Sequence, residues 1–203
     1  MSERIRIILA EDQAMMLGAL AALLGLEPDL HVIDQAREGQ SALAATLAQM
    51  PDILITDIEM PMMSGLDVAH QLKQIEVATR VIVLTTFARP GYLQRALDAG
   101  ARGYLLKESP SRTLADAIRR VHSGEQVIDS RLAAEALAER DPLTQREREI
   151  LHLAEGGARS GDIARLLQIS KGTVRNHLSQ AISKLSAGSR VEAARIARSK
   201  GWL

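Results

Sequence analysis

The chain has 203 residues, enough for one domain of ordinary size and a smaller second one. Its 46% hydrophobic and 25% charged residues indicate a globular protein. No apolar run reaches the roughly 18 residues needed to cross a bilayer, so we expect a cytoplasmic protein with no membrane insertion. The absence of Cys excludes disulfides, cysteine zinc sites and thiol nucleophiles.

The two parts of the chain differ in charge although the whole is neutral. Residues 1–141 hold 14 Lys/Arg and 20 Asp/Glu, a net charge of −6, whereas residues 142–203 hold 11 and 5, a net charge of +6. A basic segment favours nucleic acid as a partner. An incidentally basic surface is the alternative reading of the charge alone.

Short apolar runs alternate with helical patterns as far as residue 122. We expect strands at 5–10, 31–34, 53–57, 81–85 and 103–107, and helices at 13–25, 39–50, 65–74, 90–100 and 110–122. Strands separated by helical crossovers form a parallel sheet with both faces covered. The pattern predicts an α/β doubly wound domain with a five-stranded parallel sheet. The helix at 13–25 is apolar almost all round, which favours either deep burial or a second apolar partner such as another subunit.

Polar side chains stand where these strands end: Glu11 and Asp12 after the first, Asp57 at the third, Thr85 at the fourth and Lys107 at the fifth. The carboxyl ends of parallel strands meet at one edge of a sheet, where ligands bind. Crowded carboxylates need a cation, and an oxygen-only site without Cys or His suits Mg²⁺ better than zinc. No glycine-rich nucleotide fingerprint is present. Taken alone, Asp57 could instead cap the following turn.

With these five positions, the segment from residue 4 to about 123 resembles the receiver domain of bacterial two-component response regulators, predicted here as domain 1–123. The resemblance implies that Asp57 accepts a phosphoryl group from a sensor histidine kinase. It also implies that Mg²⁺ is held by Glu11, Asp12, Asp57 and the backbone carbonyl of Glu59.

The same resemblance gives roles to residues on the last two strands. Thr85 and Lys107 match the residues that contact the bound phosphoryl group. Tyr104 matches the aromatic residue whose rotamer follows Thr85, with ordinary packing as the alternative. Phe87 lies two residues past Thr85, at a position that flanks the route of the hydrolytic water in receivers. We hypothesise that its bulk slows spontaneous dephosphorylation.

Residues 124–141 are predicted to form a partly helical linker, because they are not rich in Gly and Ser. Beyond them, Thr144 and Glu147 have the spacing of a capping box. We expect helices at 144–155, 162–167, 171–185 and 189–199, with Ser160 and Ser170 as caps of the second and third. Four short helices with a tight turn before the third predict an all-α helix-turn-helix domain at 142–203.

This tail carries a spaced signature: Leu143-Thr144-x-Arg146-Glu147-x-Glu149-x-Leu151, Ile163-Ala164, Ser170-x-x-Thr173-Val174-Arg175-x-His177 and Lys184-Leu185. The signature resembles the LuxR-type DNA-binding domain. A receiver followed by this domain is the arrangement of the NarL/FixJ subfamily.

Arg175, Asn176 and Ser179 are expected on one face of the recognition helix, where Arg can read guanine and Asn adenine. Asn176 and Ser179 are simply exposed in the alternative reading, and His177 is expected to be packed. By the resemblance, further residues serve DNA phosphates or the structure of the domain itself: Lys171, Thr173, Lys184 and Arg190.

Two further features concern DNA binding. The usual small polar pair and following Lys at the start of the second helix are replaced by Arg159-Ser160-Gly161, which puts a phosphate contact there in doubt. The last helix has an apolar side, which suits a homodimer on paired promoter half-sites.

The expected function is therefore a phosphorylation-activated transcriptional regulator that dimerises at least when phosphorylated, and not an enzyme. A magnesium-dependent phosphohydrolase with Asp57 as nucleophile and Glu59 as general acid is a second class. The lack of a cap insertion and the DNA-binding tail argue against it. A constitutive DNA binder whose front domain serves only dimerisation is a third class, which the complete set of receiver positions argues against.

Overall fold

A computed structural model describes residues 4–86, 89–138 and 141–203. The chain divides into two compact units, and the division in the connecting segment falls between Ala134 and Glu135, inside helix α6 (Ser130–Ala138). Each unit is described by itself below. Along the described ranges, no helix is both long and apolar enough to span a membrane.

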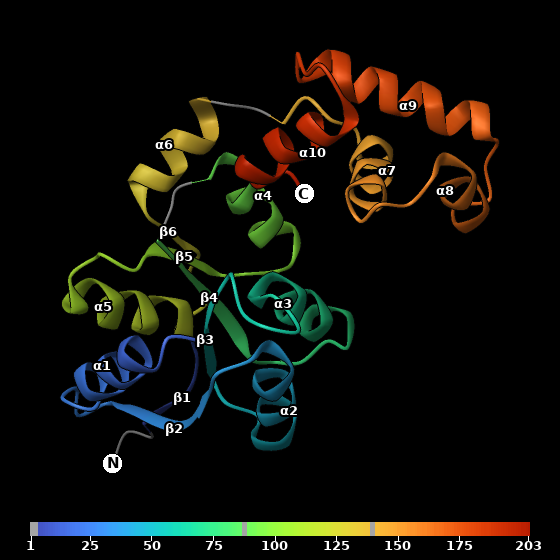
Figure 1. Cartoon of the computed structure of the whole chain (residues 1–203). Helices are drawn as coiled ribbons and strands as arrows, with labels where there is room; N and C mark the ends of the chain where they lie inside the picture. The colour runs from blue at the N-terminus through green and yellow to red at the C-terminus, as the bar shows by residue number, and fades with distance from the viewer. Residues whose placement is uncertain (1–3, 87–88, 139–140) are drawn as a thin grey trace. The chain divides into compact units, whose positions relative to one another are not determined.

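The first unit is built on one parallel sheet (Figure 1). Its strands are β1 (Ile5–Ala10), β2 (Leu30–Ala36), β3 (Ile53–Asp57), β4 (Arg80–Thr85), β5 (Gly103–Leu106) and β6 (Val127–Ile128). Their order is β2-β1-β3-β4-β5-β6, so the doubly wound prediction is confirmed. Within the described residues the sheet has six strands and not the predicted five, because Val127 and Ile128 pair with Gly103 and Tyr104. A two-residue strand is too short to show a sequence period.

Helices cover both faces of the sheet. They are α1 (Ala14–Leu24), α2 (Gly39–Gln49), α3 (Gly65–Gln74), α4 (Pro90–Asp98) and α5 (Ser111–His122). Helix α1 packs beside α5 on one face, and α2 packs beside α3 on the other (Figure 1). Of the predicted apolar residues of α1, Leu17 and Leu24 are buried, but Met15 is 89% exposed. Deep burial of α1 is therefore ruled out in the single chain.

The junction of β3 and α3 is tightly packed. The N-cap Ser64 and Asp67 satisfy each other's backbone N–H groups in a capping box, which fixes the first turn of α3. A Cβ atom at Gly65 would lie 1.9 Å from the Asp57 carbonyl oxygen and 2.5 Å from Thr56 Oγ1. Only glycine lets the helix begin this close to the end of β3.

The second unit is helical, with α7 (Gln145–Glu155), α8 (Ser160–Leu166), α9 (Lys171–Lys184) and α10 (Arg190–Ser199). Its core joins fully buried residues from all four helices, including Ile150, Ile163, Val174 and Ala197. The predicted capping box of α7 is present, since Thr144 N donates to Glu147 Oε2 at 2.7 Å and Glu147 N to Thr144 Oγ1 at 3.2 Å.

The two serine caps have different outcomes. Ser170 caps α9 as expected, accepting from Thr173 N at 3.0 Å. The prediction for Ser160 was wrong, because α8 begins at Ser160 and its N-cap is Arg159, which has no capping side chain. The connector prediction is confirmed by helix α6.

We predict that Gly65→Ala lowers the free energy of unfolding of the first unit by about 1–3 kcal/mol, the usual cost of overpacking. Gly18→Ala is the matched control. A Cβ at Gly18 has nothing within 4 Å, so alanine there is expected to stabilise α1 by about 0.5–1 kcal/mol. Urea unfolding followed by far-UV circular dichroism tests both variants. Equal stability of Gly65→Ala and the unmodified chain would contradict the close approach.

Candidate functional site

The carboxyl ends of β1, β3, β4 and β5 bring the predicted polar residues to one edge of the sheet. The register pairs Ala10 with Thr56, Asp57 with Leu84 and Thr85 with Leu106, so these strands end side by side. Glu11, Asp57 and Thr85 are all buried there. The five predicted receiver positions thus come from the ends of four strands, since Glu11 and Asp12 both follow β1. The fold brings them to one edge of the sheet, as the sequence pattern predicts.

Lys107 is the centre of this site. Its Nζ lies 2.7 Å from Glu11 Oε2 and 2.9 Å from Asp57 Oδ2, and its side chain is only 4% exposed. The second Asp57 oxygen accepts a hydrogen bond from Ile58 N at 2.7 Å. Both oxygens of the Asp57 carboxylate are therefore held in place, which rules out a role for Asp57 as a mere surface cap.

Burial and charge act against each other in this cluster. Burial raises the pKa of Glu11 and of Asp57 above their ordinary ranges, and the hydrogen bonds from Lys107 only partly offset it. Burial alone would lower the pKa of Lys107, but its two carboxylate partners outweigh that effect and leave the pKa raised. Lys107 is therefore protonated, and the site is short of positive charge.

The donor atoms of the site fit Mg²⁺. Glu11, Asp12 and Asp57 each offer a carboxylate oxygen within 4.8 Å of the others. Three carboxylates and one ammonium have a formal net charge of −2, which a divalent cation would balance. An oxygen-only set is what Mg²⁺ prefers. The residue of the predicted carbonyl ligand, Glu59, is exposed in the loop between β3 and α3.

The switch residues lie on the two strands next to β3. Lys107 N donates to the Thr85 carbonyl at 2.8 Å, which ties the ends of β4 and β5 together. Tyr104 is 1% exposed and pairs with Val83, so it lies on the same face of the sheet as Thr85. Phe87, the residue predicted to tune dephosphorylation, lies outside the described residues.

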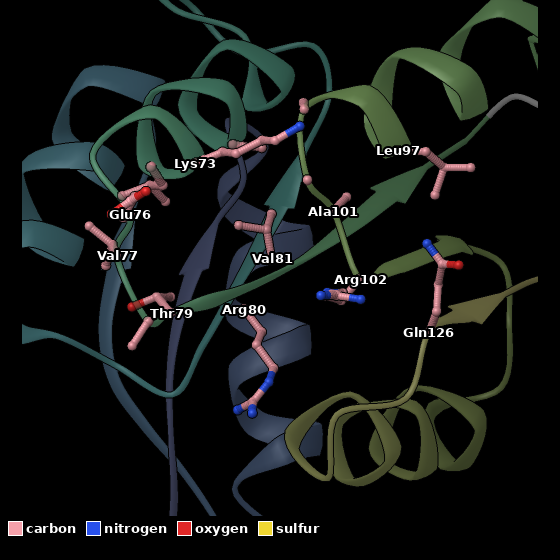
Figure 2. A pocket seen from close by; sticks show the side chains of 15 residues that line it. Lys73, Glu76, Val77, Thr79, Arg80, Val81, Leu97, Ala101, Arg102 and Gln126 are labelled. Atoms are coloured by element: carbon pink, nitrogen blue, oxygen red, sulfur yellow. The ribbon is translucent and has the colours of Figure 1, made fainter.

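A hollow of about 510 Å³ lies at the edge of the sheet opposite the carboxylates, where β4 and β5 begin (Figure 2). Lys73 lines it but already donates to the Asp98 carbonyl at 2.7 Å. Figure 2 shows the Arg80 guanidinium turned away from Lys73 and Val81. This hollow shares no residue with the carboxylate site.

In the second unit, α9 presents the predicted base-reading residues. Arg175, Asn176 and Ser179 are exposed, whereas Val174 and Leu178 face the core. His177 is half-buried, and its Nδ1 is buried without a hydrogen-bond partner among the described residues. Its expected packing role fits this environment.

Lys184 and Thr173 have partners inside the unit. Lys184 Nζ lies 2.7 Å from Glu147 Oε2, and Glu147 is 1% exposed. Thr173 Oγ1 lies 2.8 Å from Ser170 Oγ at the start of α9. By contrast, Lys171 and Arg190 line a basic hollow together with Arg159. In the sequence, Arg159 stands out only because it departs from the usual motif, and it is not predicted to contact DNA. Its place in the same lining as Lys171 depends on how α8 and α9 pack.

Comparison with known families decides the identity of both units. Residues 7–119 match the response regulator receiver domain, and residues 141–197 match the bacterial regulatory proteins of the luxR family. The chain belongs to the response regulators. It therefore combines a receiver with a LuxR-type DNA-binding domain, as the sequence predicted.

This response regulator is 52% identical over 199 residues to the transcriptional regulatory protein YvfU and 46% identical over 198 residues to the transcriptional regulatory protein DesR, both from Bacillus subtilis (strain 168). These alignments cover 98% of this chain, 100% of YvfU and 98% of DesR. The crystal structure of the response regulator ChrA, from a heme-sensing two-component system, matches with a TM-score of 0.61 and 30% identity, covering 100% of both chains.

We predict that Lys184→Met lowers the free energy of unfolding of the helical unit by about 1–2 kcal/mol at neutral pH, because it leaves the buried Glu147 carboxylate without its ammonium. Urea unfolding followed by the fluorescence of Trp202, the single tryptophan of the chain and part of this core, measures the change. Lys171→Met removes the same charge from an exposed position and is expected to stay within about 0.5 kcal/mol of the unmodified chain.

The same pair makes this difference depend on pH. Burial works to raise the pKa of Glu147, but the hydrogen bonds from Lys184 and Thr144 outweigh it, so the pKa is lowered from its ordinary 4.5. The ionised form therefore stabilises the folded unit above pH 4.5, and this contribution is lost as the pH falls through the lowered pKa. A gap between Lys184→Met and the unmodified chain that persists unchanged in acid would contradict the pairing.

Proposed function

We propose that Asp57 accepts a phosphoryl group from a sensor histidine kinase and that this step controls binding of the LuxR-type domain to promoter DNA. The observation that supports the proposal best is the buried contact of Lys107 with Asp57 and Glu11, on a chain that also presents the exposed face of α9. We assign the receiver domain to residues 1–123, the linker to 124–141 and the DNA-binding domain to 142–203.

The transfer is a displacement at phosphorus. An Asp57 carboxylate oxygen attacks the phosphoryl group of a phosphohistidine, a P–O bond forms, and the P–N bond breaks with its electron pair returning to the imidazole. Glu11, Asp12, Asp57 and the Glu59 carbonyl would hold Mg²⁺, which would neutralise charge on the transferring group. Lys107 contributes a second positive charge beside Asp57 and can follow the new phosphoryl oxygens.

Phosphorylation adds charge and acceptor oxygens at the ends of β4 and β5. The Thr85 hydroxyl moves toward these oxygens, and Tyr104 on the same face of the sheet enters the space it leaves. This rearrangement favours a homodimer on paired half-sites. Exposed apolar residues around α1 offer a surface for the second copy, since Met15 is 89% and Leu26 is 79% exposed.

Two other classes are less well supported. A phosphohydrolase fits poorly with a receiver that is followed by a LuxR-type DNA-binding domain. We therefore propose that the chain is not an enzyme. A constitutive DNA binder would have no use for the buried lysine and its carboxylates. Binding to chromosomal DNA places the proposed function in the cytoplasm.

We predict that acetyl phosphate and Mg²⁺ phosphorylate the unmodified chain but not Asp57→Asn, because the nucleophilic oxygen is lost. Phosphate-affinity electrophoresis measures the label, and light scattering measures the mass. Asp98→Asn is the matched control, since its carboxylate is exposed and accepts only from Gln94 among the contacts described. Chelation of Mg²⁺ is expected to abolish labelling. Label that persists in Asp57→Asn would place the phosphoacceptor elsewhere.

Thr85→Ala is expected to separate phosphorylation from the switch. Asp57 and Lys107 remain, so labelling continues, but the hydroxyl that follows the phosphoryl group is gone. On phosphorylation, the dimerisation constant of the variant should therefore rise about tenfold less than that of the unmodified chain. This difference corresponds to a lost coupling of about 1–2 kcal/mol. Thr86→Ala alters the exposed neighbouring threonine and should behave as the unmodified chain. Full dimerisation of labelled Thr85→Ala would remove Thr85 from the switch.

A further inference from the structure

An open basic hollow of about 440 Å³ lies on the helical unit, and residues of α8, α9 and α10 line it. Five of its lining side chains are cationic: Arg159, Arg165, Lys171, Arg175 and Arg190. Most of these residues are exposed, so the hollow opens to solvent. The remaining lining residues are Ser160, Gly161 and Asp162.

The cations of this hollow are largely uncompensated. Asp162 is the one carboxylate in the lining, and it already pairs with Arg165. In the parts of the chain that the structure describes, the other four cations have no ion pair or side-chain hydrogen bond: Arg159, Lys171, Arg175 and Arg190. Like charges held this close repel each other, so an anion that enters the hollow relieves this repulsion.

Arg159 takes part in this hollow from an unexpected position. In the resemblance drawn from sequence, the cation at the start of the second helix is a lysine, and this chain has Gly161 in its place. The structure puts Arg159, the N-cap of α8, into the same lining. A Cβ built at Gly161 meets only Lys171 Cε, at 3.8 Å, so position 161 also borders the hollow and has room for a side chain.

We propose that the hollow is the binding site of a DNA backbone phosphate. Arg159 supplies the phosphate contact that Gly161, which has no side chain, cannot make. The proposal rests on the proposed DNA-binding function. An open site suits a phosphate carried on a chain better than an enclosed small molecule. Arg159 and Lys171 then fix the register of the domain on the duplex without reading sequence, and Asn176 and Ser179 are left free for the bases.

The test uses the full chain activated with beryllofluoride and two duplexes, one selected from random sequence and one scrambled. Affinity is measured between about 0.1 and 0.3 M KCl. Arg159→Ala should bind both duplexes about tenfold more weakly, the size of one charge-assisted contact. The slope of log K against log[KCl] should become shallower by about 0.9, the value for one phosphate.

Two further variants make the test specific. Arg195→Ala removes the same charge from an exposed position on α10 outside the hollow, and it should leave the slope nearly unchanged. Arg159→Ala combined with Gly161→Lys returns a cation to the hollow from the neighbouring position, and it should restore both affinity and slope.

The outcomes separate this inference from the function on which it rests. If the unmodified chain binds duplex but Arg159→Ala loses no more than Arg195→Ala, the hollow is an incidentally basic surface. A loss confined to the selected duplex would make Arg159 a base-reading residue and also overturn the proposal. If the unmodified chain binds no duplex at all, the proposed function fails together with this inference.

Discussion

The buried ammonium of Lys107, held between Asp57 and Glu11, is the interaction on which the receiver unit depends. The two carboxylates repel each other, and they are stable together because the ammonium, 4% exposed, lies between them and attracts both. The arrangement still has an excess of negative charge once Asp12 is counted, so it is incomplete without a cation. A site that is short of positive charge and rich in oxygen ligands fits the proposed binding of a divalent cation.

The rest of the fold serves to bring these charges together. They come from the ends of three strands: Glu11 and Asp12 follow β1, Asp57 ends β3 and Lys107 follows β5. These ends lie at one edge because the sheet is parallel throughout. The tight start of α3 at Gly65 closes the loop behind Asp57, and the Lys107 amide ties β5 to Thr85 on β4. Asp57 pairs with Leu84, the neighbour of Thr85, so a short path of backbone contacts connects the two residues.

Much of this could be predicted from sequence, for reasons that differ from residue to residue. Asp57 and Lys107 are readable because a branched apolar run followed by a charged residue marks a strand end, and parallel topology then gathers such ends. The capping box of α7 is readable because Thr144 and Glu147 are local partners. Strand β6 could not be predicted, because its two residues form a strand only by pairing with β5 and are too few to show an alternating pattern.

Arg159 and Ser160 show the same limit in the helical unit. Sequence assigns Ser160 as a cap of a helix at 162–167, but α8 begins two residues earlier, at Ser160. Its N-cap is therefore Arg159, which lines the same hollow as Lys171. The pairing of Lys184 with Glu147 is also hidden, because the two residues are 37 positions apart and meet only when α7 and α9 pack. Contacts within one helical turn can be predicted from the spacing of residues in the sequence, whereas contacts between helices depend on how the core packs.

Glu147 has two attachments: it holds the first turn of α7 through Thr144 and the last turn of α9 through Lys184. One carboxylate thus fixes the C-terminal end of α9 to α7, while the opposite end of α9 carries the side chains proposed to contact DNA. The inclination of α9 is consequently set before any groove is entered. If α9 binds DNA as proposed, less orientational freedom is then lost on binding.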